Sequence, residues 1–149
     1  MSDRPQFAQL ATWLAIVSQL YTTRMTHHLN QHGFTITQFS VLNHLARHQH
    51  VQHTISDLTQ AVEVNQPGAT KIVKKLTGMG LLQSQKDTKD SRKKYVSITQ
   101  AGLAMIQTVQ QQLAPDVQAW FADWSSEEMD TFERQLQKLG IWLDSNRIG

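Results

Sequence analysis

Leu81 to Gly102 read LLQSQKDTKDSRKKYVSITQAG, and this stretch decides the fold. Two short runs, LLQSQ and KYVSI, have the composition of strands and flank the polar tip KDTKDSRK. Asp and Ser in such a tip favour a tight turn, so the stretch predicts a β-hairpin. Gly80, just before it, predicts the end of a helix, because glycine readily adopts the left-handed conformation that closes many helices.

The segment before Gly80 has the pattern of an amphipathic helix that Asn65 caps. At about 100° per residue, its apolar side chains gather in an arc of roughly 100°, which we assign to the core. They are Ala69, Ile72, Val73 and Leu76. The opposite side carries amide, hydroxyl and ammonium groups, the types that contact base edges and phosphates. It consists of Gln66, Pro67, Thr70, Lys71, Lys74 and Lys75. An ordinary solvated face is the alternative interpretation.

Positive charge is concentrated in this helix and the hairpin. Eight of the 14 Lys and Arg lie between Lys71 and Lys94, against two acids, so this window carries +6 while the whole chain carries +2. Such a concentration is typical of a site for a polyanion. A bland surface turn is the alternative for the hairpin alone, with Asp87 and Asp90 capping it or pairing with Arg92.

Upstream, apolar side chains recur at steps of three and four and predict one long helix over about 7–30, which Gly33 ends. The stripe consists of Phe7, Leu10, Leu14, Val17, Tyr21, Met25 and His28. Thr35 and Gln38 form a capping box, so a second helix should run from Ile36 to about residue 47.

Phe34 and Phe39 occupy the two positions of a hydrophobic staple around that box. Thr54 and Asp57 form another cap-like start, and a short third helix, ISDLTQAV, follows. A short helix, a turn, a helix with a basic face and a basic hairpin together predict a winged helix-turn-helix. The expected class is mainly α (α+β), with a two-stranded β-wing and long helices at both ends of the chain.

Two further apolar stripes follow the hairpin and predict two more helices, the second capped by Ser125 and Glu128. The stripes are Leu103, Ile106, Gln110, Leu113, Val117, Trp120 and Trp124, then Met129, Phe132, Leu136, Leu139 and Leu143. Pro115 falls inside the first of these helices and should kink it. A lobe of about 70 residues has too little surface to cover all these stripes, so we expect them to cover one another and a second copy. Intramolecular packing alone is the alternative.

Composition bounds the class of protein. At 149 residues and 40% hydrophobic, the chain is expected to form a single domain with its own core. It has no cysteine, which excludes disulfides, thiolate metal sites and thiol switches. Its start shows no signal-peptide pattern, and the uncharged residues 5–23 are too polar for a membrane span of about 20 apolar residues. We therefore expect a soluble, cytoplasmic protein without a membrane partner.

These residues resemble the MarR family, the multiple-antibiotic-resistance type of winged-helix transcriptional regulators. The most specific likeness is the wing, where the pattern D-x-x-D-x-R precedes a strand and an Ile-Thr-x-x-Gly helix start. Asp87, Asp90, Arg92, Ile98, Thr99 and Gly102 occupy those positions. Weaker likenesses are TQFSVL at 37–42, QPGATKIVKKL at 66–76 and SSEEMDTFERQLQKL at 125–139.

The resemblance implies one MarR-like domain over 1–149, with a winged helix-turn-helix lobe at 35–99 and dimerisation helices at 6–34 and 100–149. It also implies a homodimer whose two lobes bind a pseudo-palindromic operator in double-stranded DNA, most often as a repressor. The residues from Leu113 onward carry seven acids against three bases, which argues against DNA contact in that part of the chain.

The resemblance further implies a set of DNA contacts. Four residues would face the major groove, namely Gln66, Gly68, Thr70 and Lys71, and Arg92 would enter the adjacent minor groove. Phosphates are the better candidates for lysines, because an ammonium is a point charge. These lysines are Lys74, Lys75, Lys86, Lys89 and Lys93. Gly68 would let the helix start approach the DNA backbone closely. Asp90 is expected to orient Arg92, because phosphate repels a carboxylate.

All seven histidines lie within residues 27–53, which makes a metal-responsive regulator an alternative. They are His27, His28, His32, His44, His48, His50 and His53. Pairs four apart share a helix face, but no histidine follows the last of them and no cysteine is available. We therefore predict no metal site and no cofactor.

A small organic effector, aromatic or amphipathic, remains a candidate ligand. The resemblance implies a pocket where the first two helices meet the helix after the wing. Its candidate lining residues are Trp13, Tyr21, His28, Phe39 and His44. Aromatic residues at helical spacing are more often core residues than pocket residues, and that is the alternative for each of them.

The leading hypothesis is thus a sequence-specific transcription regulator, a repressor that a small ligand releases. A nonspecific architectural DNA-binding protein would use the same basic surface and is the second hypothesis. An enzyme is the third, but the sequence shows no nucleophile with a base at a recognisable spacing, no Gly-rich phosphate loop and no paired carboxylates. No catalytic residue is predicted.

Overall fold

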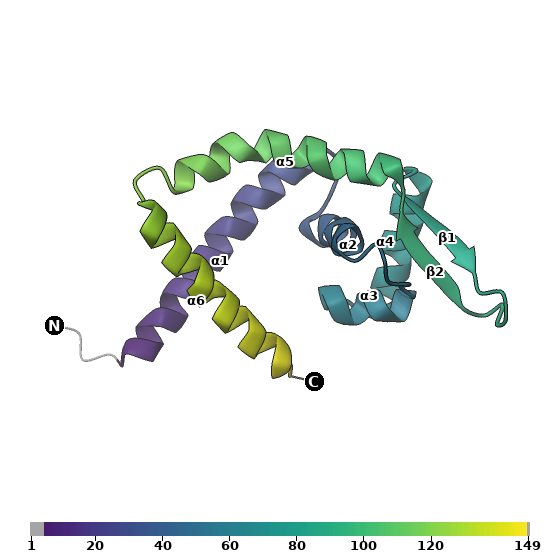
Figure 1. Cartoon of the computed structure of the whole chain (residues 1–149), viewed down its shortest axis with the longest axis horizontal. Coiled ribbons are helices and arrows are strands. Elements are labelled where there is room, and N and C mark those ends of the chain that lie inside the picture. The colour runs from purple at the N-terminus through teal and green to yellow at the C-terminus, as the bar shows by residue number, and fades with distance from the viewer. Residues whose placement is uncertain (1–4, 149) are drawn as a thin grey trace. The chain divides into compact units, whose positions relative to one another are not determined.

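The computed structural model describes residues 5–148, and within them it has the mainly α architecture that the sequence predicts (Figure 1). The elements in chain order are α1 (Gln6–Asn30), α2 (Ile36–Arg47), α3 (Ile55–Val62), α4 (Gln66–Gly78), β1 (Leu82–Lys86), β2 (Lys94–Ile98), α5 (Gln100–Trp120) and α6 (Ser126–Ser145). The short helix α3, the basic helix α4 and the β1–β2 hairpin form the predicted winged helix-turn-helix.

Local hydrogen bonds explain where α2 begins. Thr35 Oγ1 accepts the backbone N–H of Gln38 (3.1 Å), and Gln38 Oε1 accepts the backbone N–H of Thr35 (2.9 Å). This capping box satisfies two backbone donors that the helix itself leaves free. The rings of Phe34 and Phe39 lie 6.2 Å apart between centroids, so the predicted hydrophobic staple is confirmed.

The turn between α3 and α4 carries a backbone conformation that the sequence does not reveal. Glu63 has φ 55° and ψ 49°, the left-handed region that L residues rarely occupy. Glu63 directly follows α3 and ends that helix after about two turns. Asn65 then starts α4, since its Oδ1 accepts the backbone N–H of Gly68 (2.7 Å), as the sequence predicts.

The core of the lobe takes apolar side chains from each of its elements. Phe34, Leu42, Leu45, Leu58, Leu76, Leu82 and Val96 are almost fully buried. On α4, Ala69, Val73 and Leu76 are buried and Ile72 is partly buried, which confirms the predicted core side. Because this apolar side of α4 packs into the core, the opposite, polar side of the helix faces solvent.

The wing is an antiparallel pair in which Leu82 lies opposite Ile98 and Lys86 lies opposite Lys94. A third segment joins it, because the backbone N–H of Val96 donates to the carbonyl of His53 (2.7 Å). The wing is thereby fixed to the residues that precede α3.

The start of α5 packs tightly against the base of the wing. Thr99 donates its hydroxyl to the carbonyl of Gly80 (2.7 Å), and its oxygen accepts the backbone N–H of Gly102 (3.1 Å). The backbone N–H of Thr99 donates to the carbonyl of Leu81 (3.0 Å). A Cβ on Gly102 would lie 2.4 Å from that carbonyl oxygen. The Ile-Thr-x-x-Gly pattern thus has a structural role as the joint between wing and helix.

Helix α5 continues through Pro115, and the described chain divides into two compact units, one ending at Gln110 and the other beginning at Gln111. Proline lacks the N–H that would donate four residues back, to the carbonyl of Gln111. The helix therefore lacks this one backbone hydrogen bond. The effect of Pro115 on dimer geometry stays a prediction. In the second unit, Ser125 and Glu128 form the predicted capping box of α6.

Two helices expose large apolar side chains. On α1 these are Phe7, Leu10, Trp13, Leu14, Ile16, Val17, Leu20 and Tyr21, with Phe7 76% and Trp13 64% exposed. On α6, taken by itself, they include Met129, Phe132, Leu136, Leu139, Ile141, Trp142 and Leu143, and this helix has no buried residue. Within residues 5–148, no helix combines the length and apolar character that a membrane crossing requires.

Candidate nucleic-acid interface

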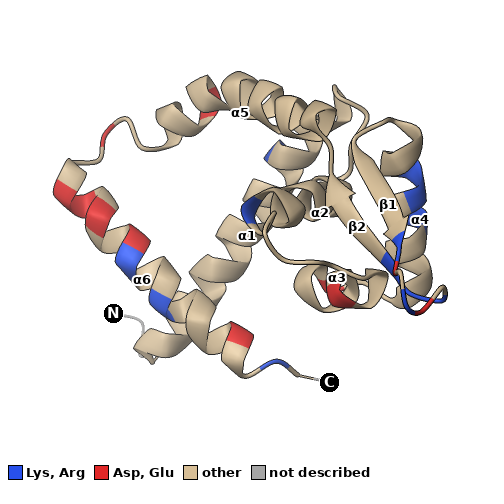
Figure 2. Ribbon diagram, turned by 45° about the vertical axis from the view of Figure 1, so that its right-hand side comes forward, with Lys and Arg blue, Asp and Glu red and all other residues tan. Residues whose placement is uncertain are grey.

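Two basic elements of the lobe form the candidate interface. Lys and Arg gather on α4 and around the tip of the wing, whereas α6 carries most of the acids in its unit (Figure 2). On α4, Gln66, Thr70, Lys71 and Lys74 are exposed. The structure therefore presents to solvent the polar face that the sequence assigned to DNA.

The start of α4 is shaped by its own cap. A Cβ at Gly68 would lie 2.9 Å from Asn65 Oδ1, the atom that accepts the Gly68 N–H. A larger residue here would therefore push the Asn65 side chain from its capping position, a reason for glycine that adds to the close DNA approach expected from the sequence. Thr70 donates its hydroxyl to the carbonyl of Gln66 (3.0 Å), which leaves its oxygen and methyl group for a base edge.

Lys75 differs from the other lysines of α4. Its Nζ donates to the carbonyl of Gly33 (2.9 Å) and to Oε1 of Gln38 (3.1 Å). The sequence placed Lys75 among the phosphate contacts. The structure gives two of its three N–H donors to the protein instead.

The wing tip holds Arg92 in an ordered turn. Asp90 Oδ1 accepts both the backbone N–H of Arg92 (3.0 Å) and its Nε–H (3.2 Å). The backbone bond first, and then the guanidinium, hold the pKa of the Asp90 carboxyl below its usual value. The Arg92 side chain is 90% exposed, so its remaining donors point to solvent. The contact expected between Asp90 and Arg92 is present.

One residue of this surface is not among those expected from the sequence. Lys94 lies directly opposite Lys86 in the hairpin, and like charges directly opposite destabilise a strand pair. An anion beside the two ammonium groups would remove this repulsion. Lys86, Lys89, Lys93 and Lys94 are all exposed. The two lysines are seen to be opposite each other only when the register of the hairpin is known, and the sequence does not predict that register.

Three of the histidines, from α2 and the segment before α3, lie close together. The ring centroids of His44, His48 and His53 lie 4.6 to 6.3 Å apart, and Nε2 of His53 lies 3.0 Å from the His48 carbonyl. Burial first, and then the neighbouring histidines and Arg47, lower the pKa of His44 below its ordinary value. Among residues 5–148, no three His, Asp or Glu side chains are placed to hold a metal ion.

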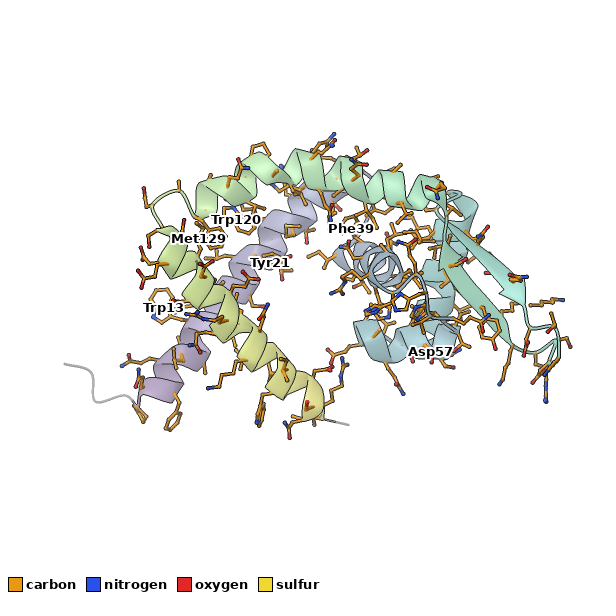
Figure 3. All side chains as sticks on the ribbon, in the orientation of Figure 1. Trp13, Tyr21, Phe39, Asp57, Trp120 and Met129 are labelled. Carbon is orange, nitrogen blue, oxygen red and sulfur yellow. The ribbon has the colours of Figure 1, made fainter. Side chains whose placement is uncertain are left out.

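The five candidate pocket residues lie in different surroundings. Trp13 and Tyr21 are exposed on α1, whereas Phe39 on α2 is buried beside Phe34 (Figure 3). His28 lies beside its neighbour His27 (5.8 Å between centroids), and His44 belongs to the group of three described above.

A hollow that the sequence did not suggest lies in the second unit, at the start of α6. Trp124, Thr131, Phe132 and Gln135 line it. The rings of Phe121, Trp124 and Phe132 pack beside one another, with centroids 5.2 to 6.3 Å apart. The sequence shows these aromatic residues, but it does not show that their rings pack together, because that depends on the turn between α5 and α6.

Comparison with known proteins gives the relatives of this fold. Residues 32–93 match the model of the MarR family. Wild-type apo MarR from E. coli has the same fold, with a TM-score of 0.75, 21% identity and coverage of 93% of this chain and 98% of that one. MepR of S. aureus in a DNA-binding conformation matches with a TM-score of 0.71, 21% identity and coverage of 90% and 98%.

A mutant of E. coli MarR complexed with operator DNA matches with a TM-score of 0.70 and 21% identity, over 91% of this chain and 99% of that one. At this identity the likeness to solved structures shows the fold. No curated protein matches the sequence.

Proposed function

We propose that the chain is a transcription regulator of the MarR family, whose model matches residues 32–93, and that it binds a pseudo-palindromic operator in double-stranded DNA as a homodimer and represses transcription there. One observation carries the proposal: the polar face of α4 and the basic wing lie on the same lobe, both exposed (Figure 2). A groove-reading helix beside a basic hairpin offers base contacts and phosphate contacts together.

The proposed contacts follow from what each side chain offers. Gln66, Thr70 and Lys71, with Gly68 at the helix start, would meet base edges in the major groove. Arg92 would enter the adjacent minor groove, because its exposed guanidinium is held in place by Asp90. Phosphate contacts fall to the exposed lysines Lys74, Lys86, Lys89, Lys93 and Lys94. Lys75 is left out of this set because of its internal bonds.

The apolar faces of α1 and α6 support the homodimer. A helix that exposes as many large apolar side chains as α1 requires a partner surface, since monomeric proteins rarely expose such patches. Trp13 and Leu20 lie on the part of α1 that is exposed, and α6 by itself buries nothing. A second copy brings an identical pair of helices, and the resulting two-fold symmetry matches an inverted repeat in the DNA.

We further propose that a small aromatic or amphipathic molecule releases the repressor from DNA. MepR, a solved structure with this fold, is a transcription regulator of the S. aureus multidrug efflux pump MepA. A ligand that favours a lobe spacing unsuited to two successive grooves would weaken binding by population shift. A regulator of this kind acts in the cytoplasm, beside the DNA that it controls.

The salt dependence of DNA binding tests this proposal. If four or five lysines of each lobe contact phosphates, a dimer neutralises about 8 to 10, and the slope of log K against log salt should be about −7 to −9. One lobe alone would give about half that slope. Competition between the selected operator and a random duplex separates the regulator from an architectural protein, since a ratio near one supports the latter.

A further inference from the structure

We infer that Lys75 is a positioning residue: it holds the recognition helix α4 against the turn between α1 and α2 and thereby sets the angle at which α4 meets DNA. This inference rests on the proposed function of the lobe. It gives a basic side chain of the interface a role other than phosphate contact. The two roles predict different changes in the salt dependence of DNA affinity when the side chain is removed.

Three elements meet at the Lys75 ammonium. Its Nζ donates to the carbonyl of Gly33, 42 residues away, at 2.9 Å, and to Oε1 of Gln38 at 3.1 Å. Gly33 has φ 79° and closes α1. Oε1 of Gln38 also accepts the backbone N–H of Thr35 (2.9 Å), so one oxygen bonds both to the start of α2 and to α4. We call the two hydrogen bonds of the Lys75 ammonium the tether.

The other lysines on α4 lack such partners. No hydrogen bond or ion pair joins Lys71 or Lys74 to another residue in the part of the chain that the structure describes. Both ammonium groups are therefore available to DNA, whereas Lys75, in the last turn of α4, has one N–H donor left. The three lysines form a matched set on one helix, of which only Lys75 is tethered.

The tether connects the reading helix to the dimerisation helix. The turn at Gly33 directly follows α1, the helix whose exposed apolar face we assign to the dimer. A side chain that reads a base must be held within about 0.5 Å of its place. Loss of the tether should therefore lower the ratio of operator affinity to random-DNA affinity. We expect a loss of about 3- to 10-fold in operator affinity, which is about 0.6–1.4 kcal/mol and lies within the net contribution of one hydrogen bond.

The test compares Lys75→Met with Lys74→Met, both of which keep the aliphatic stem. The affinity of each variant for the operator duplex selected by the wild-type protein, and for a random duplex, is measured between 50 and 200 mM salt. Lys75→Met should lose about 3- to 10-fold on the operator and much less on random DNA, with an unchanged salt slope. Lys74→Met should weaken both alike and reduce the slope by about 0.9 for each lobe.

Two further variants separate positioning from general damage. Gln38→Ala and Lys75→Met should be non-additive in the ratio of operator to random affinity, because each removes the same bond. Lys75→Arg should restore the ratio, since a guanidinium supplies the missing donors. Circular dichroism confirms that each variant is folded at the assay temperature.

A salt slope for Lys75→Met that falls as it does for Lys74→Met would overturn the inference, as would additive effects of Gln38 and Lys75. Either result leaves the proposed regulator intact. A wild-type protein that prefers no sequence would instead refute the proposed function, and with it the role assigned to Lys75.

Discussion

Replacing Gly102 with alanine should destabilise the protein through one close approach at the base of the wing. The added Cβ would lie 2.4 Å from the Leu81 carbonyl oxygen and 2.5 Å from Cγ1 of Ile98. Real Cβ atoms essentially never come within 3.0 Å of another heavy atom, so the start of α5 must shift by about 0.6 Å. The carbonyl is not free to rotate away, because it accepts the backbone N–H of Thr99 at 3.0 Å.

Two opposing effects decide the size of the change. Alanine favours a helix over glycine by about 1 kcal/mol. Overpacking costs about 1–3 kcal/mol, and the shift endangers two hydrogen bonds of Thr99, each with a net contribution of about 1 kcal/mol. The clash therefore dominates, and Gly102→Ala should lower the free energy of unfolding by about 2–4 kcal/mol. For a chain of this size, that corresponds to a fall in Tm of about 5–15 °C.

Thermal unfolding followed by circular dichroism measures the effect, at one protein concentration because a dimer makes Tm concentration-dependent. Gly78→Ala is the matched control, since a Cβ at Gly78 meets nothing within 4 Å. It should leave Tm unchanged or raise it slightly. A Gly102→Ala protein as stable as the control would refute the assigned role of this contact.

Three further results are expected. Arg92→Ala should flatten sequence preference while Lys86→Ala weakens binding to all DNA alike, measured by competition with random duplex; equal uniform losses would contradict the base-reading role of Arg92. Glu63→Gly should raise the stability by about 1 kcal/mol, because glycine adopts φ 55° without the strain of a Cβ, and an unchanged Tm would argue against that strain. Acidification below the ordinary His44 pKa of 6.5 should lower Tm, because burial and His48 lower the folded-state pKa and the unfolded chain takes the proton first. Above pH 6.5 this effect vanishes, and His44→Gln should reduce the loss at acidic pH; an equal loss in both proteins would exclude His44 as the cause.

The helix starts could be predicted from the sequence because their signals are local. Thr35 and Asn65 each bond to a backbone N–H three residues ahead, and those partners are visible in the printed chain. The spacing of apolar residues likewise predicts which side of α4 is buried, since helix geometry alone fixes it.

Contacts between distant residues could not be predicted in this way. The bonds of Lys75 to Gly33 and of Val96 to His53 depend on how the elements dock, and an exposed lysine carries no mark of its partner. The helix α1 shows a second limit. Its stripe continues without a break from the exposed Phe7 to the buried Met25, because the face proposed for the dimer and the core face have the same periodicity.

We propose that two copies of the chain together bind one specific DNA sequence, and selection of bound duplexes from a random pool tests this most directly. The purified protein is equilibrated with the pool at about 150 mM salt, and the bound fraction is sequenced. We expect enrichment of an inverted repeat with half-site centres about 10 base pairs apart. A bound pool with no enriched sequence, or an enriched site without two-fold symmetry, would contradict it.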